Sequence, residues 1–195
     1  MYRFLNKALS VFIAVIYGLA IFFTVEVLLF KKDLNSGGAS LVIESGETVK
    51  IIRIIDGDEV QAQCNDQRFV VRLLGIKSYD PSVNDPNLQN FARLALYFLE
   101  ETLLNQEVLV YYDNYKFDSK GRLLAYIEYN NKDVGLEMVS MGYSLVYDRF
   151  EFSRMEGYKA VEAETITERE GLWAVPKLRV RSMELKKIWA KKKRG

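Results

Sequence analysis

Two short stretches of this sequence carry the residues that could do chemistry. The stretch DGDEV at 56–60 holds Asp56 and Asp58, and the stretch VRLLGIKSYD at 71–80 holds Arg72, Lys77 and Asp80. Carboxylates are the ligands that hard divalent cations prefer, and a guanidinium binds oxyanions through paired hydrogen bonds. Together the two stretches are typical of one metal-dependent active site, except that Lys77 stands where a second carboxylate would be wanted.

The composition excludes several classes of catalytic site. The 195 residues include no histidine, so Ser-His-Asp catalysis, Cys-His catalysis and histidine-ligated zinc or haem cannot arise within this chain. The single cysteine, Cys64, cannot form an internal disulfide, and its place in the alternating run EVQAQC predicts a small strand residue. The net charge of +1 provides no overall attraction for nucleic acid. Any chemistry must therefore use carboxylates, Arg, Lys, Tyr or Ser.

The segment 8–30 is apolar, with Glu26 as its one charged residue. A helix rises about 1.5 Å per residue, so this segment is long enough to cross a hydrocarbon core of about 30 Å. Residues 1–33 are therefore predicted to form an uncleaved single-pass anchor in membrane lipid, and residues 34–46 a flexible linker. Glu26 fits either a local pairing with the lysines that follow the segment or a contact with a partner helix. Basic residues flank both ends, which leaves the orientation open.

Residues 47–174 predict a mainly β domain with helices (α+β). Asp56-Gly57 is a strong turn signal between two strand-like runs, and Asp85-Pro86 is typical of a helix start. The expected strands are 47–56, 59–64, 68–76, 107–115 and 122–130, and the expected helices are one from 86, then 134–141 and 151–169. Five short antiparallel strands with three helices suit the partly open barrel called the OB-fold.

Residues 175–195 form a basic tail, expected to be helical, around Trp189. Its basic cluster consists of Lys186, Lys187, Lys191, Lys192, Lys193 and Arg194. A solvated helix end explains such a run without any partner. Anionic lipid head groups would suit a basic cluster with an aromatic residue beside a membrane, and nucleic acid is the third alternative.

Five motifs follow one another along the chain: IIDGDEV, VRLLGI, DSKGRLLAYI, VGLEMVSMGYSLV and EREGLW. In this order and at this spacing they resemble the staphylococcal nuclease (thermonuclease-like) family. The resemblance covers residues 48–174, roughly two thirds of the chain. It implies an OB-fold that cleaves phosphodiester bonds of DNA or RNA with one calcium ion.

The resemblance also implies a role for each matched residue. Asp58 would be a calcium ligand, and a second carboxylate ligand would stand at position 77. Arg72 and Arg122 would hold the phosphate and stabilise the charge that develops in the transition state. The carboxylate at position 80, here Asp80, would orient or activate the attacking water.

Three matched positions depart from the family pattern, because Lys77 replaces an aspartate, Tyr79 a proline and Asp80 a glutamate. Two like unit charges about 4 Å apart repel by about 4 kcal/mol at an effective dielectric of about 20, and a dication feels twice that repulsion. We therefore expect Lys77 to pair with Asp58 and fill the metal position. Asp80 is one methylene shorter than glutamate, so a water that it held would be displaced by roughly an ångström.

Each retained residue also has a purely structural interpretation. Asp58 could serve the turn that begins at Asp56. Arg72 lies inside an apolar strand and needs a buried partner, for which Asp58 or Asp80 is available. Arg122 could be a solvated strand start.

Three functions remain open at this stage, and the third, a module that binds nucleic acid or lipid head groups without catalysis, overlaps the first. Lys77 and the predicted anchor favour a membrane-anchored domain that has lost nuclease activity, needs no cofactor and serves as a structural or binding module, such as an accessory subunit among other membrane-protein subunits. The alternative is an active metal-dependent phosphodiesterase that acts on DNA or RNA near a membrane, with calcium and a substitute ligand such as Asp56. The basic start MYRFLNKALS is compatible with mitochondrial import, which makes the mitochondrial inner membrane the expected compartment.

Overall fold

The computed structural model describes residues 43–83 and 85–193, together with Tyr17, Ile21 and Thr24 of the first 42 residues. Its contacts divide the chain into two units, Met1–Leu41 and Val42–Gly195, and each is described by itself. The predicted anchor at 8–30 lies outside the described residues apart from those three. Among the helices that are described, none is both long and apolar enough to cross a membrane.

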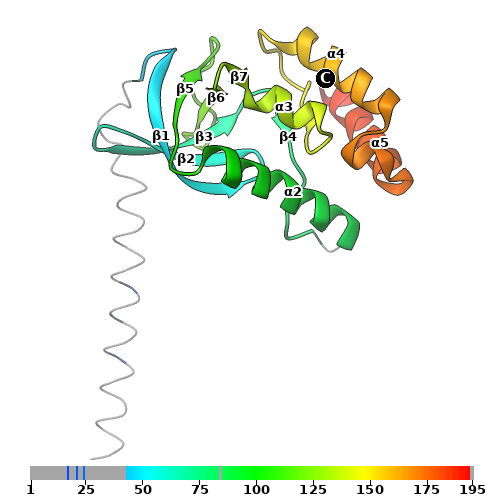
Figure 1. Ribbon diagram of the computed structural model, residues 1–195, viewed down its shortest axis with the longest axis horizontal. Coiled ribbons are helices and arrows are strands. Elements are labelled where there is room, and N and C mark those ends of the chain that lie inside the picture. The colour runs from blue at the N-terminus through cyan, green and yellow to red at the C-terminus, as the bar shows by residue number, and fades with distance from the viewer. Residues whose placement is uncertain (1–16, 18–20, 22–23, 25–42, 84, 194–195) are drawn as a thin grey trace, which may run out of the picture. The chain divides into compact units, whose positions relative to one another are not determined.

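Five strands close into a barrel, as expected for an OB-like fold (Figure 1). They are β1 (Glu47–Asp56), β2 (Glu59–Cys64), β3 (Gln67–Leu73), β5 (Glu107–Tyr111) and β6 (Leu123–Tyr129). Neighbouring strands are antiparallel in the order β3-β2-β1-β5-β6, and a parallel pairing of β3 with β6 closes the ring. Closure leaves none of the five strands with a free edge along its whole length.

The barrel strands follow from alternation in the sequence. Val49 and Ile51 of β1 and Val60 and Ala62 of β2 are buried, while most residues between them are partly or fully exposed. The turn between β2 and β3 contains Asn65 at a φ of 51°, a left-handed conformation that asparagine tolerates well. One face of each strand therefore fills the barrel interior.

Helix α2 (Pro86–Leu103) begins as the sequence predicts. The Asp85 side chain accepts hydrogen bonds from the backbone N–H groups of Asn87 (3.0 Å) and Leu88 (3.4 Å), and Pro86 occupies the first turn. The buried residues of the helix recur at helical spacing and are Leu88, Ala92, Ala95, Leu99 and Leu103. This face packs against β1.

Several boundaries differ from the expectation, since the strands expected at 68–76 and 107–115 end at 73 and 111, whereas the helix expected in the tail at 175–195 is present at 176–193. The described helices also include α3 (Val134–Ser140), α4 (Met155–Glu168) and α5 (Pro176–Lys193), with a 3-10 turn η1 (Gly171–Ala174) and short strands β4 (Ile76–Lys77), β7 (Lys132–Asp133) and β8 (Leu145–Val146). The expected third helix therefore starts at Met155 instead of 151. A fourth α-helix, α5, occupies the stretch expected to be a tail.

Helix α5 is part of the folded unit, which corrects the expectation of a solvated tail. Leu178 and Trp189 of α5 are buried in a cluster with Trp173, and the Trp189 ring lies 4.8 Å from the Tyr147 ring, centroid to centroid. The Lys186 ammonium pairs with the Glu162 carboxylate of α4 at 2.6 Å. Figure 1 shows α4 and α5 side by side at the end of this unit away from the barrel. Trp189 and Lys186 therefore make contacts within the domain. Neither side chain is free to contact lipid head groups or nucleic acid in this structure.

The core position of α2 generates a stability prediction. Leu99→Ala should lower the free energy of unfolding by about 2–5 kcal/mol, because it leaves a cavity at a fully buried site. Leu94→Ala, on the exposed face of the same helix, should change it by less than about 0.5 kcal/mol. Urea unfolding followed by circular dichroism measures both values, and equal losses would contradict this placement of α2.

Candidate functional site

The barrel topology gathers three of the predicted site residues from three separate segments. Asp58 lies in the turn between β1 and β2, and Arg72 stands on β3 directly opposite Glu59 of β2. Arg122 immediately precedes β6, whose first residue, Leu123, pairs with Val71 of β3. The closure of the barrel between β3 and β6 therefore brings Arg122 to the same end of the sheet as Arg72.

Asp58 is fully buried and is held on one side by three donors. Its Oδ2 accepts from Lys77 Nζ (2.9 Å) and the Ser78 backbone N–H (2.8 Å), and it lies 3.0 Å from Arg72 Nη2. Its Oδ1 is buried and makes no hydrogen bond with any described residue. The expected pairing of Lys77 with Asp58 is confirmed, so the lysine ammonium sits on the one carboxylate that the resemblance assigns to the metal.

The close approach of the Ser78 segment requires Gly57. A Cβ at Gly57 would lie 2.8 Å from the Cβ of Ser78 and 2.9 Å from the Cβ of Ala95. The Ser78 hydroxyl donates to the Gly57 carbonyl at 2.7 Å and contacts the Ser144 hydroxyl at 2.6 Å. The glycine therefore allows β4 to approach the turn closely enough for Ser78 to reach Asp58.

Arg72 is locked by the backbone as well as by Asp58. Its Nη1 donates to the carbonyls of Asp58 (3.0 Å) and Leu73 (3.1 Å), and its Nη2 donates to the carbonyl of Ile76 (2.9 Å). The side chain is only 10% exposed. Of the two partners considered from sequence, the structure selects Asp58, and the guanidinium also ties together the segments on either side of the turn at 74–75.

Arg122 is also paired, which contradicts its interpretation as a solvated strand start. Its Nε donates to Asp118 Oδ2 at 2.7 Å, and its Nη1 binds Glu59 Oε1. The same Oε1 of Glu59 lies 4.0 Å from Arg72 Nε. Glu59 thus connects the two arginines.

The charges of this cluster balance. Its three cations (Arg72, Lys77 and Arg122) face three anions (Asp58, Glu59 and Asp118). The pKa of the Asp118 carboxyl lies below its ordinary value. Burial raises this pKa, but the hydrogen bonds from Arg122 and Lys120 together lower it by more than burial raises it. These six side chains are therefore balanced in charge among themselves, and Asp56 and Asp80 lie within electrostatic range of Lys77.

Asp80 and Asp56 lie beside this cluster without joining it. Asp80 is exposed, and its Oδ1 accepts from the Ser82 N–H at 2.7 Å, which lowers its pKa. Burial raises the pKa of Asp56, and the neighbouring Asp58 adds to the rise, although the Gly57 N–H opposes it. Among the described residues, no hydrogen bond or ion pair links Asp80 to Asp58 or to either arginine. Of the predicted residues, the structure brings together Asp58, Arg72 and Arg122 but leaves Asp80 apart.

Sequence reasoning missed three residues of the cluster. Glu59 could have been found from the β2–β3 hairpin, because counting back from its tight turn at Asn65 pairs position 59 with Arg72. Asp118 is four residues before Arg122 in a turn, a spacing that allows their contact. Ser78 gave no signal, since its role depends on the fold of β4 against β8.

Tyr79, at the position where the resemblance expects proline, has a partner outside the matched motifs. Its hydroxyl lies 2.8 Å from the hydroxyl of Ser182 on α5, and both residues are shielded from solvent by neighbouring side chains. Burial raises the pKa of the Tyr79 phenol. The tyrosine therefore fixes the segment after Lys77 to α5.

The calcium site that the resemblance implies does not fit these residues. No group of three or more Asp, Glu, Cys or His side chains within 43–83 and 85–193 is arranged to hold a metal ion. Asp58 is the one carboxylate at the matched position, and the Lys77 ammonium already binds it. A dication at Asp58 would lie against an ammonium group and would gain a single anionic ligand, whereas such ions usually take more than one.

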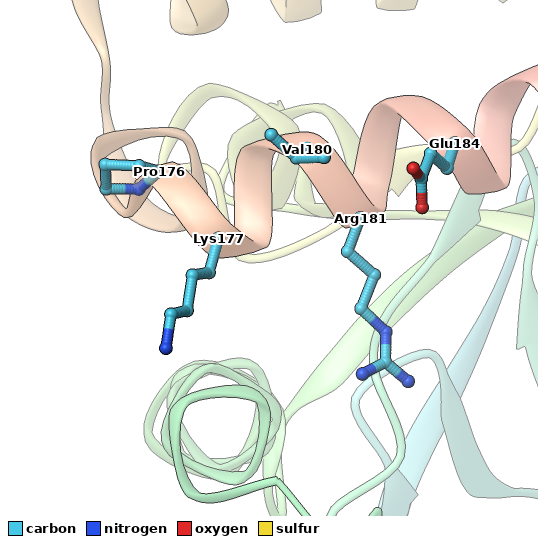
Figure 2. A pocket seen from close by; sticks show the side chains of 5 residues that line it. All are labelled: Pro176, Lys177, Val180, Arg181 and Glu184. Atoms are coloured by element: carbon cyan, nitrogen blue, oxygen red, sulfur yellow. The ribbon is translucent and has the colours of Figure 1, made fainter.

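One hollow of the surface lies elsewhere. It has a volume of about 630 Å³ and is lined by Pro176, Lys177, Val180, Arg181 and Glu184, all on α5. Figure 2 shows Lys177 and Arg181 projecting from the same side of that helix. Because one helix supplies every lining residue, this hollow is an open groove and does not belong to the cluster around Asp58.

Comparison with known proteins points in one direction. A family model described as staphylococcal nuclease homologue matches residues 70–175. An uncharacterized protein, MJ1439, of Methanocaldococcus jannaschii is 30% identical over 64% of this chain and 70% of its own length. A thermonuclease of Staphylococcus hyicus is 33% identical over 63% of this chain and 69% of its own length. A probable endonuclease, LCL3, of Leptosphaeria maculans is 32% identical over 55% of this chain but 38% of its own length.

The buried pairing of Asp58 predicts a large effect of neutralising it. Asp58→Asn should lower the free energy of unfolding by about 3 kcal/mol, because it leaves Arg72 without its carboxylate in a site that is nearly closed to solvent. Asp66→Asn, in an exposed turn, is the matched control and should change it by less than about 0.5 kcal/mol. Chemical denaturation measures both values. An unchanged free energy of unfolding in Asp58→Asn would show that the pairing does not stabilise the fold.

Proposed function

Because the chain belongs to the staphylococcal nuclease homologue family, we propose that it is a membrane-anchored member that has lost phosphodiester hydrolysis and serves as a binding or structural module. The family membership rests on the match at 70–175 and on the relatives from Methanocaldococcus jannaschii and Staphylococcus hyicus. The loss of hydrolysis rests on the geometry around Asp58.

The observation that carries the proposal is the 2.9 Å contact between Lys77 Nζ and Asp58 Oδ2. Substituting an ammonium for a carboxylate changes the local charge by two units at the position where a cation would bind. At about 4 Å and an effective dielectric of about 20, a dication and an ammonium repel by roughly 8 kcal/mol, and one carboxylate ligand would have to offset this repulsion in place of two. The lysine is thus an internal substitute for the metal: it neutralises Asp58 but cannot polarise a phosphate or activate water as a metal ion does.

The position of Asp80 supports the same proposal. Its carboxylate is exposed and accepts a hydrogen bond from the Ser82 N–H, within its own loop. A general base must lie within hydrogen-bonding reach of the water it activates. A carboxylate one methylene shorter than glutamate, with one oxygen already bound by the Ser82 N–H, is poorly placed for that task.

The membrane part of the proposal rests on the sequence of residues 8–30 and on its length, as described above. A family member without hydrolysis that is fixed to a bilayer suits the role of an accessory subunit in a larger membrane complex, with the mitochondrial inner membrane as the proposed compartment. Gentle solubilisation of native membranes followed by size separation tests this role. Migration of the chain by itself would contradict it.

The alternative function is an active, metal-dependent nuclease. It would follow the names of two relatives, thermonuclease and probable endonuclease, and the retention of Asp58, Arg72 and Arg122. Asp56 would then have to supply the second carboxylate. The raised pKa of Asp56, caused first by its burial, works against that role because it disfavours the charged form.

A cleavage assay decides between the two functions. The full chain in non-ionic detergent, incubated with labelled single-stranded DNA or RNA and either calcium or magnesium, should produce no more cleavage than the same mixture with a chelator. The reason is that Lys77 excludes the cation on which hydrolysis depends. A thermonuclease assayed in parallel serves as the positive control.

Chelator-sensitive cleavage would overturn the proposal if it depended on the cluster. The test of dependence is loss of that cleavage in Arg72→Ala and in Arg122→Ala, each checked for folding by circular dichroism. Arg68→Ala is the matched control, since Arg68 lies on the same strand as Arg72 but is exposed. Cleavage that survives in all three variants would come from a contaminant and would leave the chain without activity, as proposed.

A further inference from the structure

The Glu59 carboxylate lies between the two arginines of the cluster. Its Oε1 binds Arg122 Nη1 and lies 4.0 Å from Arg72 Nε. Two guanidinium groups that converge on one oxygen form a receptor for an oxyanion, since each presents planar N–H donors. In this chain the oxyanion in that receptor is a side chain of the protein itself.

The fold fixes Glu59 in this place. The register of β2 and β3 sets Glu59 opposite Arg72, and residues directly opposite in an antiparallel pair have their Cβ atoms about 4.5–5.5 Å apart. The parallel pairing of β3 with β6 then carries Arg122 to the same carboxylate. Glu59 reaches both arginines because of barrel closure, so the contact does not depend on a flexible loop.

The cluster is accessible to a ligand from solvent. The side chains of Glu59 and Arg122 are 21% and 19% exposed, whereas Asp58 is fully buried. Asp58 neutralises Arg72 from the interior, and Asp118 neutralises Arg122 from the neighbouring turn. Glu59 is therefore the anion of the cluster that a ligand could replace while the other pairs stay intact.

We propose that Glu59 is a built-in competitor for the anion site of Arg72 and Arg122, so that a nucleic-acid phosphate binds there only by displacing the Glu59 carboxylate. This inference rests on the proposed function in one respect, namely that the cluster does not hydrolyse the phosphate it binds. With Glu59 in place, the affinity for phosphate is its intrinsic value multiplied by the fraction of time that the carboxylate is away from the arginines. Removing the carboxylate also gives the cluster a net charge of +1, since three cations then face two anions.

Glu59→Gln tests the proposal directly. The full chain in non-ionic detergent, with chelator present, is titrated into a fluorescein-labelled oligonucleotide of ten thymidines at low salt, and fluorescence anisotropy gives Kd. We expect Glu59→Gln to bind about tenfold more tightly than the wild type, the equivalent of one charge-assisted contact made available to the ligand. Adding Arg122→Gln to that variant should remove the gain.

Two further variants separate competition from a general change of charge and from misfolding. Glu101→Gln, on the exposed face of α2, changes the net charge equally and should leave Kd within about twofold. Glu59→Asp keeps the charge but withdraws the carboxylate by one methylene, so we expect a smaller gain in the same direction. It also covers the case in which Glu59→Gln does not fold.

Equal affinities of Glu59→Asp and the wild type, both folded by circular dichroism, would overturn the proposal. A gain in Glu101→Gln as large as in Glu59→Gln would overturn it too, since the effect would then be one of net charge. Either result leaves the absence of hydrolysis untouched, because chelator is present throughout. Conversely, metal-dependent cleavage in the separate assay would overturn the proposed function without changing these affinities.

Discussion

A buried carboxylate must be matched by positive charge or hydrogen-bond donors, and Asp58 imposes that constraint on the whole site. An isolated charge in a protein interior carries a large desolvation penalty. Here Lys77, Ser78 and Arg72 all converge on one oxygen of Asp58. A divalent cation would satisfy the same constraint, so the lysine and a metal ion are alternative solutions to one electrostatic problem.

Several other features of the domain follow from this solution. Gly57 is required where it lies because Ser78 approaches so closely, and Arg72 holds the segment that carries Lys77 by binding the Ile76 carbonyl. Tyr79 then fixes that segment to Ser182 of α5, a helix that follows the family-matched residues 70–175. The substitutions at 77 and 79 are thus supported by contacts, as expected for a cluster stabilised in a neutral form.

The barrel could be predicted from the sequence because the residues that specify each strand and turn lie next to one another in the chain. Alternating apolar residues and the turns at Asp56 and Asn65 specify β1, β2 and β3, and the cap at Asp85 specifies the start of α2. The pairing of Lys77 with Asp58 followed from charge alone. The docking of α5 could not be predicted in this way. The many lysines of α5 obscure any apolar pattern in its sequence, and Leu178 and Trp189 are buried by contacts with Trp173 and Tyr147, which are distant in the sequence. The hydrogen bond from the Ser82 N–H to Asp80 could not be predicted either, because it depends on the local loop conformation.

The central claim is that Lys77 occupies the position of the cation, and a calcium titration tests it most directly. Isothermal titration calorimetry compares the wild type with Lys77→Asp, each as a full chain in non-ionic detergent and each shown to be folded. The account predicts no saturable binding to the wild type at millimolar calcium and saturable binding to Lys77→Asp, because the substitution removes the ammonium and adds a second carboxylate. Saturable calcium binding to the wild type that disappears in Asp58→Asn would contradict it.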